Sequence, residues 1–143
     1  MGSYEVGLMA HVLVIDDDKH VRALMREMLE RAGHRVREAD DGRCGVAAFT
    51  GEPADLVIVD LFMPEQGGWE TIRALQDLAP GLPFVIVSGG GALEGLQPGS
   101  TGTLDAVSGV ADYRVLRKPF EWKVFTAAVS DLLDARPVPL GAK

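Results

Sequence analysis

The sequence predicts an α/β fold: a doubly wound, five-stranded parallel sheet with helices on both faces. Short apolar runs of strand length recur along the chain, and stretches with the apolar spacing of helices lie between them. Parallel strands need such crossovers, which are right-handed, so the alternation favours an open parallel sheet. The two strand segments that mix polar with apolar residues belong at the edges, which gives the strand order 2-1-3-4-5.

Five segments are expected as strands. Segments 12–15, 56–59 and 84–87 are apolar at every position and mostly β-branched, which is typical of central strands covered on both faces. Segment 35–39 alternates like an edge strand, and segment 113–116 is also mixed.

Four segments are expected as helices, over residues 19–32, 43–49, 69–78 and 121–133. The first has the clearest pattern, and Gly33 follows as its stop. Its apolar residues, spaced for one buried face, are Val21, Leu24, Met25, Met28, Leu29 and Ala32. The inward residues expected in the last helix are Val124, Phe125, Ala128 and Leu132.

Residues 88–109 interrupt this alternation where a further helix belongs. The stretch holds seven of the 17 glycines of the chain, and it also contains Pro98. Glycine raises the entropic cost of a helix. We therefore expect an irregular fourth-helix region, in which the helix is short or displaced.

The length of 143 residues suits one domain, which we expect over residues 10–135. Residues 1–9 contain a Gly-Ser pair of the kind found in expression tags and are expected as a tag or a disordered leader. Residues 136–143 carry two prolines and are expected as a tail or the stub of a linker, with no effector domain after them in this chain.

The composition excludes several function classes. With 14 Lys and Arg against 21 Asp and Glu, the net charge is −7, which argues against direct binding of nucleic acid or of an anionic membrane. Cys44 is the single cysteine, so no intrachain disulfide forms, and we expect it to be a small buried residue. His11, His20 and His34 lack metal-site spacing and are expected at the surface. No apolar run could cross a bilayer, so we expect a cytoplasmic protein.

Polar residues follow the predicted strands at the point where each strand ends. Asp16-Asp17-Asp18 follow the first strand, Asp60 the third, Ser88 the fourth and Lys118 the fifth. The carboxyl ends of parallel strands meet at one edge, so these side chains converge there. Clustered carboxylates stay ionised only if a cation neutralises them, and an all-oxygen ligand set favours Mg²⁺. Taken alone, Asp17 or Asp18 could equally be a helix N-cap.

Four motifs in this order resemble the receiver domains of two-component response regulators, which have a flavodoxin-like fold. They are VLVIDDD at 12–18, DLVIVDLFMP at 55–64 with Gly67-Gly68 after it, VIVSG at 85–89, and LRKPF at 116–120. The resemblance covers residues 10–135.

The resemblance implies roles for the residues at the sheet edge. Asp60 would be the phosphoacceptor, converted to an aspartyl phosphate. Asp16, Asp17 and Asp60, with the backbone carbonyl of Phe62, would hold Mg²⁺. Lys118 would pair with the carboxylate and then with a phosphoryl oxygen, and Ser88 would donate a hydrogen bond to another such oxygen.

The same resemblance implies a signalling phosphoacceptor and not an enzyme in the ordinary sense. Its phosphodonor would be a sensor histidine kinase or a histidine phosphotransfer protein, and its output a downstream protein or a missing effector domain. Homodimers are common in the family, and the sequence does not decide between monomer and dimer. A phosphohydrolase of the haloacid-dehalogenase type would need an acidic residue where Phe62 stands. The remaining alternative is a phosphorylation-independent interaction adaptor.

Two positions depart from the family pattern. Receivers usually have an aromatic residue three positions before the lysine, and here that residue is Val115. Tyr113 lies on the same face of the strand, and we hypothesise that a bulge or local shift lets it substitute. Phe62 stands two residues after the phosphoacceptor, where it would shield the phosphoryl group from water, so a Phe62→Asn variant is predicted to lose the group faster.

Overall fold

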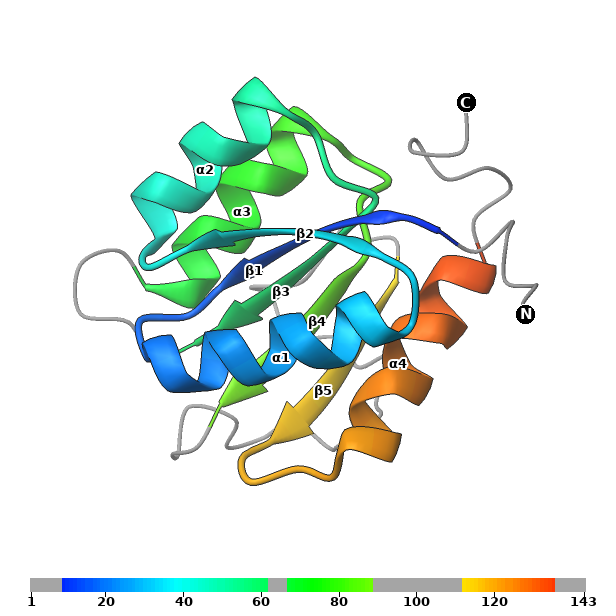
Figure 1. Ribbon diagram of the computed structural model, residues 1–143. Helices are drawn as coiled ribbons and strands as arrows, with labels where there is room; N and C mark the ends of the chain where they lie inside the picture. Colours follow the sequence, from blue (N-terminus) through cyan, green and yellow to red (C-terminus); the bar gives the residue numbers. More distant parts are fainter. Residues whose placement is uncertain (1–8, 62–66, 89–111, 136–143) are drawn as a thin grey trace.

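The computed structural model describes residues 9–61, 67–88 and 112–135, in which five strands and four helices alternate (Figure 1). The elements are β1 (His11–Ile15), α1 (Lys19–Arg31), β2 (Arg35–Ala39), α2 (Gly42–Gly51), β3 (Leu56–Asp60), α3 (Gly68–Leu78), β4 (Phe84–Ser88), β5 (Tyr113–Arg117) and α4 (Trp122–Asp134). Every predicted strand and helix in these ranges is present, with ends that differ by one or two residues. None of these helices is long and apolar enough to cross a membrane.

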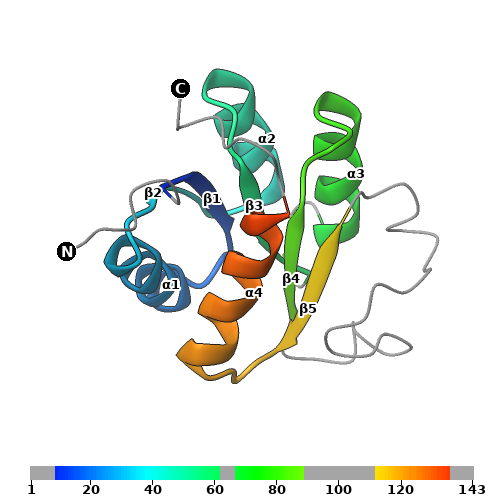
Figure 2. The same ribbon diagram turned by 90° about the vertical axis from the view of Figure 1, so that its right-hand side faces the viewer.

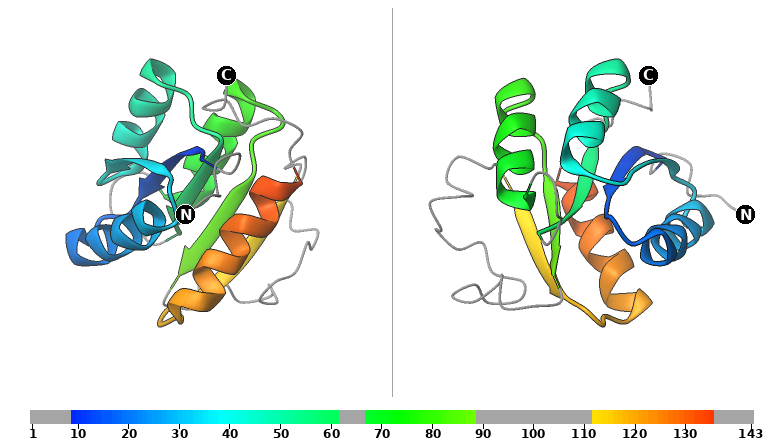
Figure 3. Two further views of the ribbon diagram at one scale, coloured as in Figure 1. Left: turned by 45° about the vertical axis from the view of Figure 1, so that its right-hand side comes forward. Right: turned by 90° about the vertical axis from the view of Figure 1, so that its left-hand side faces the viewer.

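The strands form one parallel sheet of order β2-β1-β3-β4-β5, which confirms the predicted topology. Helices α2 and α3 cover one face, and α1 and α4 lie side by side on the other (Figures 1 and 2). Because all strands run the same way, their carboxyl ends share one edge of the sheet (Figure 3).

Two apolar cores form, one on each face of the sheet. Successive residues of a strand point to opposite faces, so Val57 and Val59 pack under α2 and α3, while Leu56 and Ile58 pack under α1 and α4. Every residue of β3 and β4 is buried, as their uninterrupted apolar runs predict.

The edge strand β2 carries charge on one of its faces. Arg35 and Arg37 are exposed and contact Glu52, at N–O distances of 3.4 and 2.6 Å. The Arg37 hydrogen bond is the main reason why the pKa of Glu52 lies below its usual range.

Two glycines fix the paths of the chain into and out of helices. Gly33 has φ = 96°, a left-handed conformation that favours glycine. It lies just after the C-cap of α1 and turns the chain toward β2. Gly68 begins α3, and a Cβ there would lie 2.6 Å from the Leu61 Cα and 2.7 Å from the Asp60 carbonyl oxygen. A side chain at residue 68 would therefore push α3 away from the end of β3.

Several predictions about single side chains are wrong. Leu24 and Val124 are 57% and 47% exposed, because they lie on the flanks of the buried stripes of α1 and α4. Ala32, which we expected on the same buried face as Leu24, is also exposed. Cys44 is exposed, on the outer face of α2. His34 is buried rather than at the surface, and its Nδ1 accepts a hydrogen bond of 3.2 Å from the Ala10 N–H.

Some predictions fall on residues outside the described ranges. These are most of the leader expected over residues 1–9, the irregular fourth-helix region within residues 89–111, the two roles assigned to Phe62, and the tail or linker stub expected over residues 136–143. The domain limits of 10 and 135 also stay predictions.

Candidate functional site

The sheet topology brings the predicted site residues to one edge. Asp16 directly follows β1, Asp60 and Ser88 are the last residues of the neighbouring strands β3 and β4, and Lys118 directly follows β5. The register pairs Asp60 with Val87, the residue before Ser88. Three of the four side chains are almost completely buried, with exposures of 0% for Asp16, 4% for Asp60 and 1% for Ser88.

Lys118 connects two of these carboxylates. Its Nζ lies 3.1 Å from the Asp16 Oδ2 and 3.2 Å from the Asp60 Oδ2. Two buried carboxylates repel each other unless a cation lies between them, and the ammonium group supplies that charge. The long-range contact therefore joins the ends of β1, β3 and β5 through a single side chain.

Burial and the two carboxylates act in opposite directions on the pKa of Lys118. Burial of the ammonium group lowers the pKa, whereas the charges and hydrogen bonds of Asp16 and Asp60 raise it. The carboxylates prevail, so the pKa lies above its usual range. Lys118 is consequently a cation near neutral pH.

Asp16, Asp17 and Asp60 form a group of carboxylates that fits a divalent ion. Each offers one oxygen, and the three oxygens lie within 4.8 Å of one another. Mg²⁺ binds oxygen at about 2.0–2.1 Å, so ligands on opposite sides of the ion lie about 4.2 Å apart. The all-oxygen donor set and this spacing both fit Mg²⁺, and the exposed Asp17 leaves room for water ligands.

Asp18 serves the helix and not this group. Its Oδ1 accepts hydrogen bonds from the backbone N–H groups of His20 at 2.9 Å and Val21 at 3.2 Å. These bonds, that of Val21 first, hold the pKa of Asp18 below its usual range. The structure thus identifies Asp18 as the N-cap of α1 and decides the question that the sequence leaves open between Asp17 and Asp18.

The sequence did not predict a contact between Arg22 of α1 and the backbone of Asp16. The Arg22 Nη1 donates a hydrogen bond of 2.7 Å to the backbone carbonyl of Asp16, and its Nε lies 3.0 Å from the Glu38 Oε1. Arg22 stands one helical turn after Asp18, where the pattern of α1 alone predicts only a polar residue.

The bulge that we expected near Tyr113 is not present in β5. Strands β4 and β5 pair without a bulge, from Phe84 with Tyr113 to Ser88 with Arg117. Tyr113 is buried at the start of β5, in the same core as Val115, and remains at the end of the strand opposite to Lys118. The bulge is therefore absent from this structure, and the substitution of Tyr113 for Val115 in a switch stays a prediction.

A second group of potential ligand atoms lies at the start of α2. Asp40, Asp41 and Cys44 also bring three such atoms within 4.8 Å. Asp41 is the N-cap of α2, and its Oδ1 accepts a 2.7 Å hydrogen bond from the Cys44 N–H. A hydrogen bond to Asp41 and the charges of Asp41 and Asp40 raise the pKa of the Cys44 thiol.

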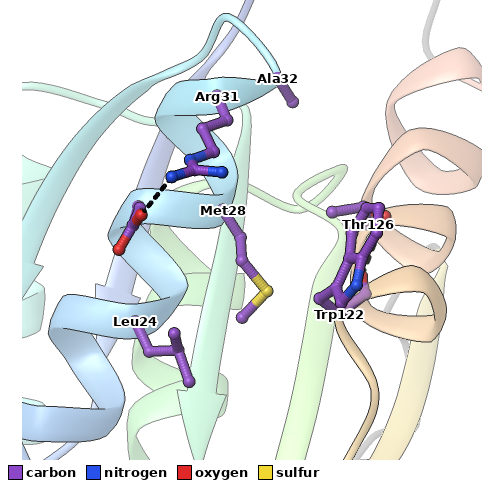
Figure 4. Close-up of a pocket in the computed structure, with 7 residues that line it drawn as sticks. Leu24, Met28, Arg31, Ala32, Trp122 and Thr126 are labelled. Carbon is purple, nitrogen blue, oxygen red and sulfur yellow. Dashed lines mark hydrogen bonds and ion pairs between the residues drawn. The ribbon is translucent and has the colours of Figure 1, made fainter.

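An apolar groove of about 510 Å³ separates α1 from α4 (Figure 4). Leu24 and Met28 of α1 line one side, and Trp122 and Thr126 of α4 line the other. Trp122 is 60% exposed. The groove runs from the middle to the end of α1 and along the first turns of α4, and none of the site residues lines it.

Comparison with known proteins decides the family. The family model described as "Response regulator receiver domain" matches residues 12–129. The chain belongs to this family. As a receiver domain of a two-component response regulator, it is 30% identical over 127 residues to the response regulator receiver protein CpdR of Brucella abortus, over 89% of this chain and 99% of that one.

Other relatives are longer than this receiver domain. The transcriptional regulatory protein GlrR of Escherichia coli is 30% identical, but the match spans 87% of this chain and only 26% of that protein. Among solved structures, a receiver domain protein of Clostridium thermocellum superposes with a TM-score of 0.74 and 28% identity, covering 87% of this chain and 94% of that one. The chemotaxis response regulator CheY4 of Vibrio cholerae has a TM-score of 0.71 and 28% identity, over 87% and 98% of the two chains.

Proposed function

We propose that this receiver domain accepts a phosphoryl group on Asp60, with Mg²⁺, and that the modification switches its contacts with other proteins. The observation that carries the proposal is the double contact of Lys118 with Asp16 and Asp60. This contact supports an acceptor carboxylate that is buried, ionised and next to a cation.

The phosphodonor is a phosphohistidine of a sensor histidine kinase or a histidine phosphotransfer protein. A carboxylate oxygen of Asp60 attacks the phosphorus, an oxygen–phosphorus bond forms, and the phosphorus–nitrogen bond to the histidine breaks. The electron pair of that bond stays on the imidazole nitrogen. The result is an aspartyl phosphate and a free histidine.

The neighbouring residues stabilise the transferred group. The Lys118 ammonium group exchanges its contact with the Asp60 carboxylate for a contact with a phosphoryl oxygen. The Ser88 hydroxyl donates a hydrogen bond to another phosphoryl oxygen. Asp16, Asp17 and Asp60 would hold Mg²⁺, together with the carbonyl of Phe62 outside the described residues. Bound Mg²⁺ supplies positive charge that offsets the charge of the transition state.

The groove between α1 and α4 supports a docking role for the donor. A histidine that reaches Asp60 has to approach the carboxyl edge of the sheet, where both helices begin. The exposed Leu24 and Trp122, on the two helices that begin at that edge, offer an apolar anchor for a helix of the donor protein. A Leu24→Ser variant should then slow transfer from the donor protein but not from a small-molecule donor.

The decisive test is phosphoryl incorporation from acetyl phosphate with Mg²⁺, followed by intact mass. We expect a mass gain of one phosphoryl group in the wild type and none in Asp60→Asn. Asp40→Asn is the matched control, because it removes an exposed carboxylate of the second group, and it should keep the gain.

One result would favour the interaction adaptor instead. A wild-type domain that binds Mg²⁺ but gains no phosphoryl group, from acetyl phosphate or from phosphoramidate, would rule out acceptor function.

A further inference from the structure

We infer that Arg22 is a positioning residue for the Mg²⁺ ligands, and that Glu38 of the edge strand holds it in place. The inference rests on the proposed function, because it concerns the metal that Asp16 and Asp17 would hold. It adds a part of the machinery that lies outside the motifs of the strand ends.

The backbone of Asp16 is fixed on both of its polar groups. Its N–H donates to the Ala39 carbonyl oxygen at 3.1 Å, and its carbonyl oxygen accepts from the Arg22 Nη1 at 2.7 Å. Both partners lie toward β2, since Ala39 ends that strand and Arg22 is held by Glu38. The turn after β1 is therefore tied to the neighbouring strand on the side away from Lys118 and Asp60.

Arg22 is held in one geometry by a small ionic network. Its Nε lies 3.0 Å from the Glu38 Oε1, while the Arg26 Nη1 lies 2.7 Å from the Glu38 Oε2. The side chains of Arg22 and Glu38 are only 16% and 26% exposed. Hydrogen bonds from Arg26, and then from Arg22, keep the pKa of Glu38 below its usual range despite partial burial. Charge-assisted bonds in such a network hold direction better than an isolated surface pair.

The restrained carbonyl bears directly on Asp17. The Asp16 carbonyl and the Asp17 nitrogen belong to one planar peptide group. A hydrogen bond that fixes the carbonyl therefore also restrains the orientation of the Asp17 backbone nitrogen and Cα. Asp17 is exposed and has no buried surroundings to direct it. Mg²⁺ demands near-ideal octahedral geometry, and loss of an outer partner of a metal ligand typically costs about 10- to 100-fold in affinity.

The test measures Mg²⁺ dissociation constants by titration calorimetry on Arg22→Met and Arg26→Met. Arg26 is the matched control, because it binds the same Glu38 but does not reach Asp16. We expect Arg22→Met to raise the Kd by about tenfold and Arg26→Met by less than about twofold. Glu38→Gln should fall between them, because Arg22 would keep its bond to Asp16 with a weaker anchor.

A second variant and a second readout separate positioning from general instability. Arg22→Lys keeps a positive charge but loses the planar guanidinium group, which reaches both Glu38 and the Asp16 carbonyl. This variant should therefore weaken Mg²⁺ binding. Its thermal unfolding midpoint should stay near that of Arg26→Met. Raising the Mg²⁺ concentration to saturation should restore most of the phosphorylation rate in both Arg22 variants.

The outcomes are distinguishable. Unchanged Mg²⁺ affinity in the Arg22 variants would overturn the inference, and so would equal weakening in Arg22→Met and Arg26→Met. Selective weakening in the Arg22 variants, in a domain that takes up no phosphoryl group, would sustain the inference and reject the proposed function. Failure of the wild type to bind Mg²⁺ would overturn both.

Discussion

Two groups of side chains in the described residues each bring three potential metal-ligand atoms within 4.8 Å of one another, yet the groups differ in burial and in the elements that supply them. Asp16, Asp17 and Asp60 lie at the ends of two strands, and Lys118, after a third strand, contacts Asp16 and Asp60. The other group, Asp40, Asp41 and Cys44, spans five consecutive positions at the start of α2 and is largely exposed.

The comparison teaches that charge density does not by itself define a site. In the group at α2, Asp41 is engaged as a helix N-cap and the Cys44 thiol holds its proton, so the local backbone accounts for the whole arrangement. In the group at the sheet edge, the carboxylates of Asp16 and Asp60 are buried, which costs free energy because they lose contact with water. The Asp16 Oδ1 also accepts a local hydrogen bond of 2.8 Å from the Asp18 N–H, but the approach of Asp16 and Asp60 to one lysine joins three strands, and such buried clusters of titratable groups are typical of functional sites.

The largest effect should follow removal of the cation from the sheet-edge group. Lys118→Met would leave Asp16 and Asp60 buried without their partner, so we expect a loss of about 3 kcal/mol in the free energy of unfolding at pH 7 without Mg²⁺. Added Mg²⁺ should recover part of the loss. Urea unfolding measures both quantities. The control is Arg43→Met beside the other acidic group, which should cost less than about 0.5 kcal/mol, and equal losses would remove the distinction between the groups.

Mg²⁺ affinity should separate the two groups next. Asp17→Asn should raise the Mg²⁺ Kd by at least about tenfold, because it removes a charged ligand. Asp40→Asn should leave the Kd unchanged. Without Mg²⁺, Asp17→Asn should be at least as stable as the wild type, since one like charge is gone from the cluster. A Kd that responds to Asp40→Asn would show that the group at α2 also binds the ion.

The smallest effect concerns the protonation of Cys44. Because Asp41 and Asp40 raise the pKa of the thiol, the pH midpoint of its alkylation by iodoacetamide should lie above that of an unperturbed cysteine. Asp41→Asn keeps a good N-cap but loses the charge, so the midpoint should fall and alkylation at pH 8 should become about threefold faster. High salt should narrow this difference, as it does for exposed charges. A midpoint that does not respond to Asp41→Asn would mean that the carboxylates do not control the thiol.

Much of the fold and of the candidate site could be predicted because both depend on the order of elements. Runs such as 56–59 fix the central strands, and parallel topology alone brings Asp16, Asp60 and Lys118 to one edge. The family match over residues 12–129 agrees with this prediction.

What the sequence could not predict depends on packing between elements. The periodicity of α1 groups Leu24 with the buried residues, but Leu24 lies on the flank of the buried stripe and lines the groove between α1 and α4. The bond from Arg22 to Asp16 depends on where Glu38 falls in the register of β2. His34 is buried where its ring accepts a hydrogen bond from the Ala10 N–H. The two residues directly precede the neighbouring strands β2 and β1, so their contact depends on how these strands pair.

The charged face of β2 has a consequence for the behaviour of the domain at high concentration. A parallel sheet ends in a strand with unpaired backbone groups, which another chain could extend. Arg35 and Arg37, with Glu52 between them, lie along this strand, so an incoming strand would have to strip water from three charges. The β2 edge of the sheet is thereby protected against aggregation by strand addition. Glu38 points to the other face of β2, where it holds Arg22.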